Sequence, residues 1–275
     1  MAVTAREIEA YLEYLYREER SAATREKYRR SLLDFAAYLA GRAPDKAAVI
    51  EWKERLTGAV STRNAAISAV NGLLKYLGSP ECCVRQFRCQ RRVFCGEGER
   101  LSRGEFERLV RAAEDRGQQR LARAMETIAG TGIRVSELRH FTVERVREGM
   151  VTVTNKGKSR SVLLPAALRK KLLAYCRARG IRCGEIFVTQ SGCSLSREQL
   201  WAEMKRLCTA AGVPRGKVYP HNLRHLFATV HYRLHRDIVK LADLLGHSSV
   251  NTTRIYLLDS GREHLRQLEA MRLVI

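Results

Sequence analysis

Hydrophobic residues in the first 80 positions recur every three to four residues, which is the spacing of one helix face. Three stretches share this period: residues 4–40, 49–56 and 61–77. Ser61 or Thr62 is a suitable N-cap for the third stretch, and Pro80 follows its end. We therefore predict a small all-helical domain over residues 1–83.

The pattern changes after this domain. Residues 84–100 lose the period and accumulate arginines, which predicts a basic linker. Ser102 and Glu105 then have the spacing of a capping box, in which each side chain binds the backbone N–H of the other residue. A second domain is therefore expected over residues 101–275.

Strand-like alternation of apolar and polar residues is concentrated in the runs 151–153 and 161–165, around a turn at 155–158. A weaker strand pattern occurs at 185–188. The expected fold is mainly α. It combines the N-terminal helical domain with an α+β C-terminal domain that contains a small antiparallel sheet.

A helix is predicted to open at Pro220, because proline suits the first helical position. Its apolar stripe should face the core and consists of Leu223, Leu226, Phe227, Val230 and Leu234. The opposite face carries His221, Arg224 and His225 near the helix N-terminus, where free N–H groups and the helix dipole favour a phosphate.

Two glycine turns flank further candidate residues. Gly130 and Gly132 break the chain before a helical restart at 133–138. Gly246 suits the left-handed position that ends a helix, which would put the following His247 at a fixed corner. Ser248 or Ser249 would then cap a last helix that carries Tyr256.

The net charge of +21 comes from 50 Lys+Arg against 29 Asp+Glu. Such a chain is too basic for an ordinary enzyme of small neutral molecules, so a polyanion is the expected partner. Neither an apolar leader nor an apolar run of about 18 residues occurs, so secretion and membrane crossing are not expected, and we predict a cytoplasmic protein.

Metal binding is not expected from the cysteines or histidines. The eight cysteines include no C-x-x-C pair, and we expect free buried thiols. His231 and His235 share a helix face but lack a third ligand, so we interpret them as surface or packing residues. The sequence leaves open the role of the cluster Cys82, Cys83, Cys89 and Cys95.

In chain order, the run 131–138, Lys156, His221-x-x-Arg224, Leu245-Gly246-His247 and Tyr256 resemble the motifs of the tyrosine recombinase (phage integrase) family, and the Xer type is the nearest pattern. Each motif alone is common, but their order, spacing and identity agree at six positions. The motifs cover residues 101–260. The N-terminal half is similar only in being a helical bundle, like the family's SAM-like core-binding domain.

The resemblance implies that Tyr256 attacks a DNA phosphate and forms a 3′-phosphotyrosyl link, with no metal, ATP or other cofactor. His221 is the expected base, because a phenol with a pKa of about 10 needs a proton acceptor or a positive field. The planar forks of Arg134 and Arg224 suit the nonbridging oxygens of the transition state.

Other residues are assigned supporting roles by the same resemblance. Lys156 is similar to the family's general acid for the leaving 5′-oxygen, with Lys158 as the rival candidate. His247 is expected to hydrogen-bond a phosphoryl oxygen, and Glu137 and His225 are expected to support the site without reacting.

The expected partner is double-stranded DNA that carries two inverted core half-sites. From the length we expect no additional N-terminal arm-binding domain. The basic residues expected to contact DNA are Arg25, Lys27, Arg29, Arg63, Lys75, Arg88, Arg91, Arg92 and Lys158.

An apolar stripe after Tyr256 contains Leu265, Leu268, Met271 and Ile275. The resemblance implies that this tail docks onto a neighbouring protomer in a DNA-bound homotetramer. The alternative is that the tail packs on its own protomer.

The leading hypothesis is a site-specific recombinase for integration, excision or resolution. A type IB topoisomerase-like relaxing enzyme and a catalytically silent DNA-binding regulator remain as alternatives. The target DNA sequence, the biological task and any need for a partner recombinase cannot be deduced from the sequence.

Overall fold

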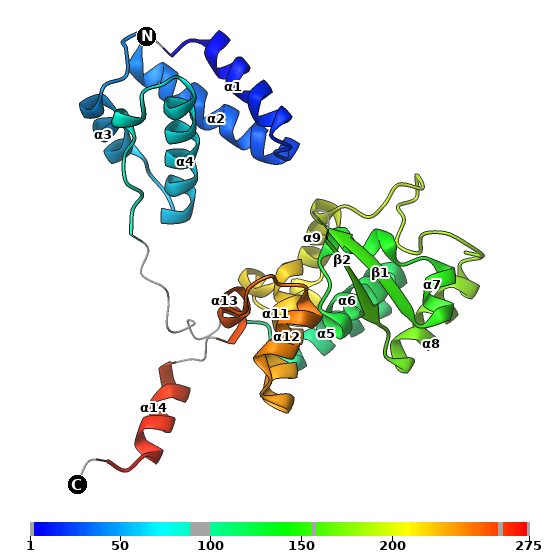
Figure 1. Cartoon of the computed structure of the whole chain (residues 1–275). Helices are drawn as coiled ribbons and strands as arrows, with labels where there is room; N and C mark the ends of the chain where they lie inside the picture. The colour runs from blue at the N-terminus through cyan, green and yellow to red at the C-terminus, as the bar shows by residue number, and fades with distance from the viewer. Residues whose placement is uncertain (1–2, 89–99, 156–157, 258–260, 274–275) are drawn as a thin grey trace. The chain divides into compact units, whose positions relative to one another are not determined.

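The structure is a computed structural model that describes residues 3–88, 100–155, 158–257 and 261–273. The chain divides into two compact units, residues 1–91 and 92–275 (Figure 1). Among the helices within these described ranges, none is both long and apolar enough to cross a membrane.

The first unit is a bundle of helices around an apolar core. Its elements are α1 (Ala5–Arg17), α2 (Ala22–Leu39), α3 (Lys46–Arg55), α4 (Val60–Tyr76) and the 3-10 turn η1 (Pro80–Cys82). The rings of Phe35 and Trp52 meet edge to face in this core, with their centroids 5.1 Å apart. The predicted all-helical domain is thus confirmed.

The N-cap expected for α4 was wrong. The helix begins at Val60 with Ala59 as its N-cap, so Ser61 and Thr62 lie in the first turn. The N–H groups of Thr62 and Arg63 both donate to the carbonyl of Ala59. The helix therefore starts ahead of the side chains that are able to cap it.

Residues 84–87 are fastened along α4 by two asparagine amides. Asn71 donates to the carbonyl of Val84 and accepts from its N–H, at 2.8 and 3.0 Å. Asn64 makes the same pair of hydrogen bonds to Phe87, at 2.9 and 2.8 Å. The first residues of the predicted linker therefore pack as part of the first unit.

The second unit contains most of the helices and the sheet. Its elements are α5 (Arg103–Asp115), α6 (Gln119–Thr131), η2 (Val135–His140), α7 (Val143–Glu148), β1 (Met150–Asn155), β2 (Lys158–Leu163), α8 (Ala166–Ala178), α9 (Arg197–Arg206), α10 (Cys208–Ala211), η3 (Arg215–Lys217), α11 (Pro220–His235), α12 (Ile238–Leu245), α13 (Val250–Arg254), η4 (Ile255–Leu257) and α14 (Gly261–Ala270).

The predicted hairpin and capping box of the second unit are both present. Strands β1 and β2 pair antiparallel, with Met150 opposite Leu163 and Asn155 opposite Lys158. Ser102 and Glu105 form the reciprocal capping box at the start of α5. At 185–188, by contrast, the structure has isolated bridges, Thr142 with Glu185 and Val188 with Ser194, in place of a strand.

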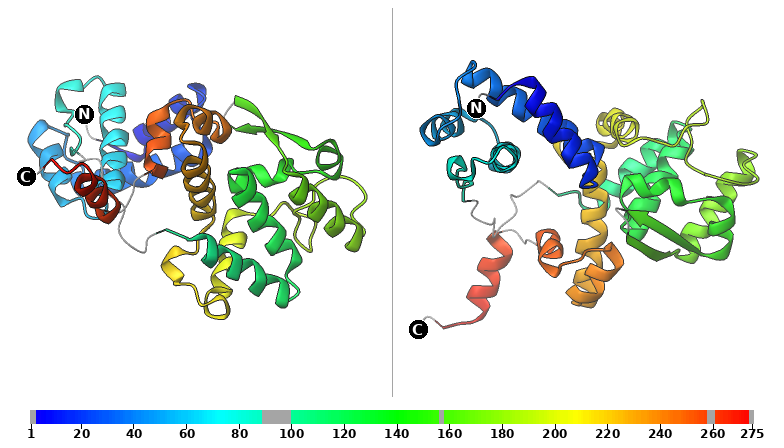
Figure 2. Two further views of the ribbon diagram at one scale, coloured as in Figure 1. Left: turned by 90° about the horizontal axis from the view of Figure 1, so that it is seen from below. Right: turned by 45° about the horizontal axis from the view of Figure 1, so that its top comes forward.

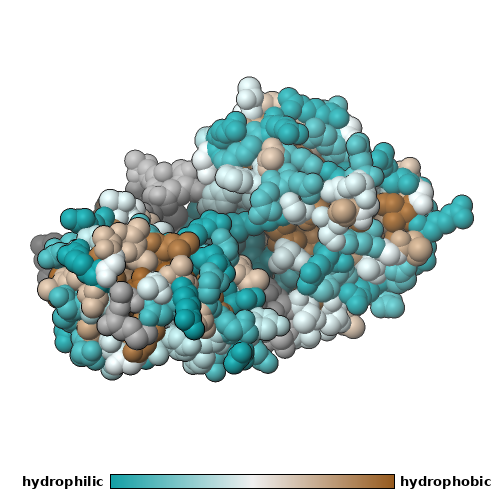
Figure 3. All heavy atoms as spheres, turned by 90° about the horizontal axis from the view of Figure 1, so that it is seen from above, coloured by the Kyte–Doolittle hydropathy of each residue, from teal (hydrophilic) through white to brown (hydrophobic). Residues whose placement is uncertain are grey.

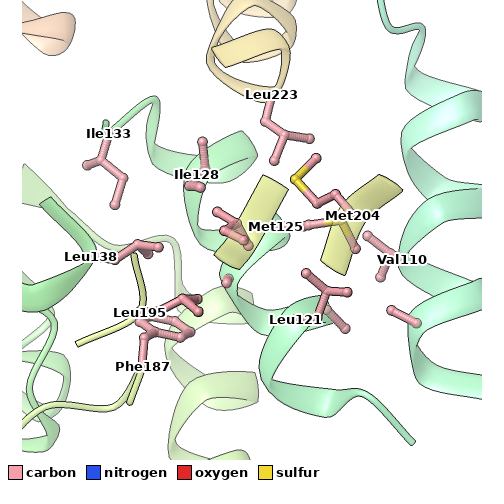
Figure 4. Packing of buried hydrophobic residues seen from close by; sticks show 14 of the residues in the cluster. Val110, Leu121, Met125, Ile128, Ile133, Leu138, Phe187, Leu195, Met204 and Leu223 are labelled. Carbon is pink, nitrogen blue, oxygen red and sulfur yellow. The ribbon is translucent and has the colours of Figure 1, made fainter. Parts of the chain in front are cut away.

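The core of the second unit lies around α6. Met125 and Ile128 of this helix are fully buried, and side chains of α5, α9 and α11 surround them (Figure 4). Helix α11 packs against α6 and α12, and the views of Figures 1 and 2 show these helices. The central helix therefore supports the N-terminal half of α11, where the candidate residues lie.

The apolar stripe expected on α11 faces the core only at its first member. Leu223 is fully buried, but Leu226, Phe227 and Val230 are half-buried and Leu234 is 72% exposed. These four side chains border a groove of about 420 Å³ between α5, α6 and α11. The expectation that the whole stripe faces the core was therefore wrong, because its later members border this open groove.

The six described cysteines are free, and three of them, Cys82, Cys176 and Cys208, are buried. The expectation of buried thiols was wrong for Cys183 and Cys193, which are exposed. On the face drawn in Figure 3, hydrophilic residues cover most of the surface and hydrophobic residues form smaller patches.

Candidate active site

The turn after α6 places the first arginine. Helix α6 continues through Gly130, and the break occurs at Gly132, which caps the helix with φ +68°. A Cβ atom at Gly132 would lie 2.4 Å from the ring of Phe227, so only glycine fits. The segment that follows, Val135–His140, is a 3-10 helix with Arg134 as its N-cap.

Arg134 and Glu137 form a compact pair at this turn. The backbone N–H of Arg134 donates to Glu137 Oε2 at 2.7 Å, and its Nη1 donates to Oε1 at 3.2 Å. The side chain of Arg134 is 34% exposed, whereas that of Glu137 is 1% exposed. Arg134 therefore keeps N–H groups that are available to a ligand.

Arg224 is buried in the protein, although helical periodicity had placed it on the polar face. It is 1% exposed. Its Nη1 donates to the carbonyl of Gly132 and its Nη2 to the carbonyl of Leu245, each at 2.7 Å. The polar side of α11 thus faces the two glycine turns, and Arg224 joins them.

His247, which follows α12, lies beside Arg224, and Tyr256 of η4 lies beside His221. Arg224 Nη2 lies 2.9 Å from His247 Nε2, and His247 Nδ1 lies 2.9 Å from the hydroxyl of Thr253. Because arginine only donates, Nε2 accepts and Nδ1 carries the proton. Ser249 caps α13, but the expectation that this helix carries Tyr256 was wrong, because η4 does.

The phenol of Tyr256 lies against two histidines of α11. Its Oη is 3.3 Å from His221 Nε2. Its ring centroid is 4.3 Å from that of His225, whose Nδ1 is buried and has no hydrogen-bond partner within the described residues. The tyrosine is 5% exposed, so its oxygen faces His221 from inside the protein.

A cavity of about 540 Å³ borders the start of α11. Its walls include Arg134, His221 and Arg224, together with two arginines that sequence reasoning missed, Arg139 and Arg197. Arg197 opens α9 directly after Ser196, which caps the helix in a capping box with Gln199. The Ser-x-x-Gln spacing in the sequence is the signal by which this helix start could have been found.

The surroundings of the cavity lower the pKa values of the three histidines near it and that of Arg224. Desolvation, then Arg224, lowers the pKa of His221, although its side chain is exposed at the cavity. Burial, then Arg224, lowers the pKa of His247 to about 4, and burial and His221 lower that of His225 to about 3. Burial and Arg134 lower the pKa of Arg224 to about 10, so it stays protonated at pH 7.

The side chains of the two lysines predicted as general acid, Lys156 and Lys158, are not described by the structure. Lys156 lies outside the described residues. Lys158 begins β2, and only its backbone is described. Arg91 and Arg92 also fall outside the described residues.

The predicted DNA-contact residues of the first unit have different surroundings. Arg29 forms ion pairs with Glu9 and Glu26, so its charge is already compensated. The guanidinium groups of Arg25 and Arg63 lie over the rings of Tyr16 and Phe87, at 4.8 and 4.4 Å. The remaining three are exposed: Lys27, Lys75 and Arg88.

Two family models match the chain. The model of the phage integrase family matches residues 99–261, and that of the phage integrase N-terminal SAM-like domain matches residues 8–79. Tyrosine recombinase XerD of Xanthomonas axonopodis pv. citri is 38% identical over 161 residues, which are 53% of this chain and 52% of that protein. The chain spans about half the length of the curated relatives it matches.

Solved structures are similar over more of the chain. The crystal structure of XerA recombinase matches with a TM-score of 0.54 and 25% identity over 98% of both chains. A lambda integrase (75-356) dimer bound to a COC′ core site matches 94% of this chain and 96% of that chain, with a TM-score of 0.76 and 19% identity, a likeness of fold alone. Because the integrase model covers more than half of the residues and the predicted motifs lie within it, the chain belongs to the phage integrase family of tyrosine recombinases.

Proposed function

We propose that the chain is a site-specific recombinase that cleaves and rejoins DNA strands through a 3′-phosphotyrosyl intermediate. One observation carries the proposal. The Tyr256 oxygen lies 3.3 Å from His221 Nε2, and His221 borders the same cavity as Arg134 and Arg224. A phenol, a neutral imidazole and two fixed cations are the groups that attack on a phosphodiester requires.

In the proposed reaction, a bond forms between Tyr256 Oη and phosphorus while the bond from phosphorus to the 5′-oxygen breaks. The phenolic proton moves to His221 Nε2. The departing 5′-oxygen takes a proton from Lys156, or from Lys158 as the alternative. The new ester retains the energy of the phosphodiester, so a 5′-hydroxyl from another strand is able to reverse the attack without ATP.

Two features of the arginines support their role as a clamp on the phosphate. Nε of Arg224 is buried and has no hydrogen-bond partner among the described residues, which leaves one N–H for an incoming acceptor. Arg134 is partly exposed at the cavity. Both side chains are held before substrate binds, so little reorganisation accompanies the chemistry.

His247 requires a change of tautomer to donate to a phosphoryl oxygen. Its Nε2 accepts from Arg224 in this structure. If a phosphate oxygen takes the Arg224 N–H, Nε2 is able to carry the proton and donate to the phosphate. Thr253 then donates to Nδ1, because a hydroxyl serves as donor or acceptor.

The proposed partner is double-stranded DNA with two inverted half-sites. The charge of +21 supports backbone binding by both domains, with residues 1–83 as the core-binding domain, 84–100 as a basic linker whose first residues pack on α4, and 101–275 as the catalytic domain. The exposed residues Lys27, Lys75 and Arg88 are the strongest candidates for phosphate contacts in the first domain.

A covalent trapping experiment tests the proposed function. Sites are first selected from random duplex DNA by binding to the protein, and a nick is then placed near the central step so that the cleaved end diffuses away. We expect a covalent protein–DNA adduct that disappears in Tyr256→Phe. Specific binding without an adduct would favour a silent regulator, and relaxation of a plasmid that lacks the selected site would favour a topoisomerase.

The C-terminal tail is proposed to dock onto a neighbouring protomer of a DNA-bound tetramer. Leu265, Leu268 and Met271 are 54%, 63% and 56% exposed in this structure. The groove beside α11 is lined by the apolar side chains Phe106, Leu226, Phe227, Val230 and Leu234, with Arg103, Glu107, Glu126, His231 and His235 also at its walls. An exposed apolar helix and an open apolar groove on the same chain are complementary between copies.

Substitutions on both sides of the proposed contact test the exchange. Leu268→Asp in the tail and Val230→Asp in the groove should each reduce coupled cleavage of two half-sites more than binding of one half-site, as should deletion of residues 262–275. Ile50→Asp, at an exposed apolar position of the first unit, is the matched control. Unchanged recombination in the deletion variant would refute the exchange.

A further inference from the structure

Arg160 of β2 occupies a core-facing position of the hairpin. It pairs with Val153 in the register, and Val151 pairs with Val162 on the same face. The three valines are 0 to 5% exposed. A charged side chain at such a position needs partners, because burial of an unpaired guanidinium is costly.

The partners of Arg160 belong to the active-site turns. Its Nη1 and Nη2 donate to the two oxygens of Glu137, at 2.7 and 3.0 Å, in a forked pair. Its Nε donates to the carbonyl of Leu244 at 3.2 Å. A Cβ atom on Gly246 would lie 2.8 Å from Arg160 Cδ, so the side chain packs directly beneath the turn that leads to His247.

Arg160, Glu137 and Arg134 form a cluster of three charged side chains, and Arg160 changes the net charge of this cluster. Glu137 accepts from both Arg160 and Arg134. Burial raises the pKa of Glu137, but the hydrogen bonds from Arg160 and from the backbone of Arg134 outweigh it, and the carboxylate stays ionised. With both arginines the cluster carries one net positive charge. Without Arg160, the carboxylate would neutralise Arg134.

We propose that Arg160 is a positioning residue for strand cleavage, which neutralises Glu137 so that Arg134 remains available to the phosphate and supports the turn of His247. The inference rests on the proposed function. Arg160 does not line the cavity, and its hydrogen bonds go to Glu137 and to the Leu244–Gly246 turn. A fork matters here, because a lysine ammonium cannot bind both carboxylate oxygens in one plane.

A suppression experiment separates this role from a structural one. Arg160→Gln should slow single-turnover cleavage of the nicked substrate on the order of 10²-fold, a typical loss when an active-site group is misplaced. Adding Glu137→Gln removes the carboxylate that pairs with Arg134. The double variant should therefore cleave roughly tenfold faster than Arg160→Gln. If both residues were only structural, the losses caused by the two substitutions would add, and the double variant would cleave no faster than Arg160→Gln.

Two further variants keep the test decisive. Arg160→Lys preserves the charge and serves if Arg160→Gln does not fold; it should slow cleavage by roughly tenfold, and Glu137→Gln should not accelerate it. Arg108→Gln is the matched control, because Arg108 braces the carbonyls of Ala211 and Gly212 in the same unit. DNA affinity and denaturant unfolding are measured for each protein.

The outcomes distinguish this inference from the proposed function. Wild-type cleavage rates in Arg160→Gln and Arg160→Lys, or a double variant no faster than Arg160→Gln, would overturn the inference alone. If the wild-type protein forms no adduct on any selected site, the proposed function fails, and the inference fails with it.

Discussion

The two units use their interiors differently. In the described ranges, every buried polar or charged residue lies in the second unit, among them Glu137, Arg224 and Thr253. The core of the first unit consists of apolar side chains, and three of its arginines, Arg17, Arg29 and Arg30, form ion pairs at the surface. An unpaired buried charge lowers the free energy of unfolding, and in the second unit Arg224 and Glu137 both have hydrogen-bond partners.

The largest expected effect follows from the buried arginine. Arg224→Lys should reduce single-turnover cleavage by roughly 10²- to 10³-fold, because one ammonium cannot hold two carbonyls and still meet the phosphate. Arg17→Lys, in an exposed pair of the first unit, should leave the rate unchanged. Equal effects of the two substitutions on the cleavage rate would contradict the difference between the buried arginine of the second unit and the exposed arginine of the first. The measurement is adduct formation on the nicked substrate.

An apolar truncation tests the other side of the comparison. Phe35→Ala should destabilise the first unit by about 3 to 5 kcal/mol, because it removes a fully buried ring from an apolar core. Cleavage by protein already bound to DNA should persist, since no residue of this core borders the cavity. Urea denaturation followed by circular dichroism measures the loss. A change below about 1 kcal/mol would contradict it.

The pH dependence of stability should come from the second unit. All seven histidines lie after residue 91. The pKa of His225 is about 3 and that of His247 about 4 in the folded protein, against about 6.5 when unfolded. The unfolded state therefore binds more protons below pH 6.5, and the free energy of unfolding falls as the pH drops from 6.5 to 5.

Denaturation curves at these two pH values check the expectation, and His225→Phe serves as the matched variant. It keeps the ring against Tyr256 but removes one titrating group, so its stability should vary less with pH. An unchanged pH slope in this variant would mean that His225 is not held neutral.

The smallest expected effects concern helix caps, which should not distinguish the units. Asp45 caps α3 in the first unit and Ser102 caps α5 in the second, each by accepting a backbone N–H. Replacing either with alanine should cost about 1 kcal/mol. A much larger loss at Ser102 than at Asp45, measured by urea denaturation, would show that the capping box of the second unit also supports tertiary contacts.

Local chemistry made much of this fold predictable. The capping box of Ser102, the hairpin register and the left-handed Gly246 each depend on residues close together in the chain. The ordered motifs also indicated the family, because residues such as Arg224 and Tyr256 occur in the order and with the spacing of its motifs. These features required only backbone preferences and spacing.

Backbone preferences and spacing could not predict which side chains are buried. Periodicity placed Arg224 on a polar surface and Leu234 in the core, and the structure reverses both. Helical spacing reports which residues share a face, but the neighbouring elements decide whether that face is covered. The contact of Arg160 with Glu137 was likewise invisible, because it joins residues 23 positions apart.

The sequence by itself determined the kinds of elements, the reactive residue types and the polyanionic partner they favour, because these follow from spacing, composition and charge. Only the tertiary structure decided which arginine is buried, which oxygen meets which imidazole, and where an apolar stripe remains open. Those outcomes depend on packing between segments far apart in the chain, and no local pattern encodes the distances involved.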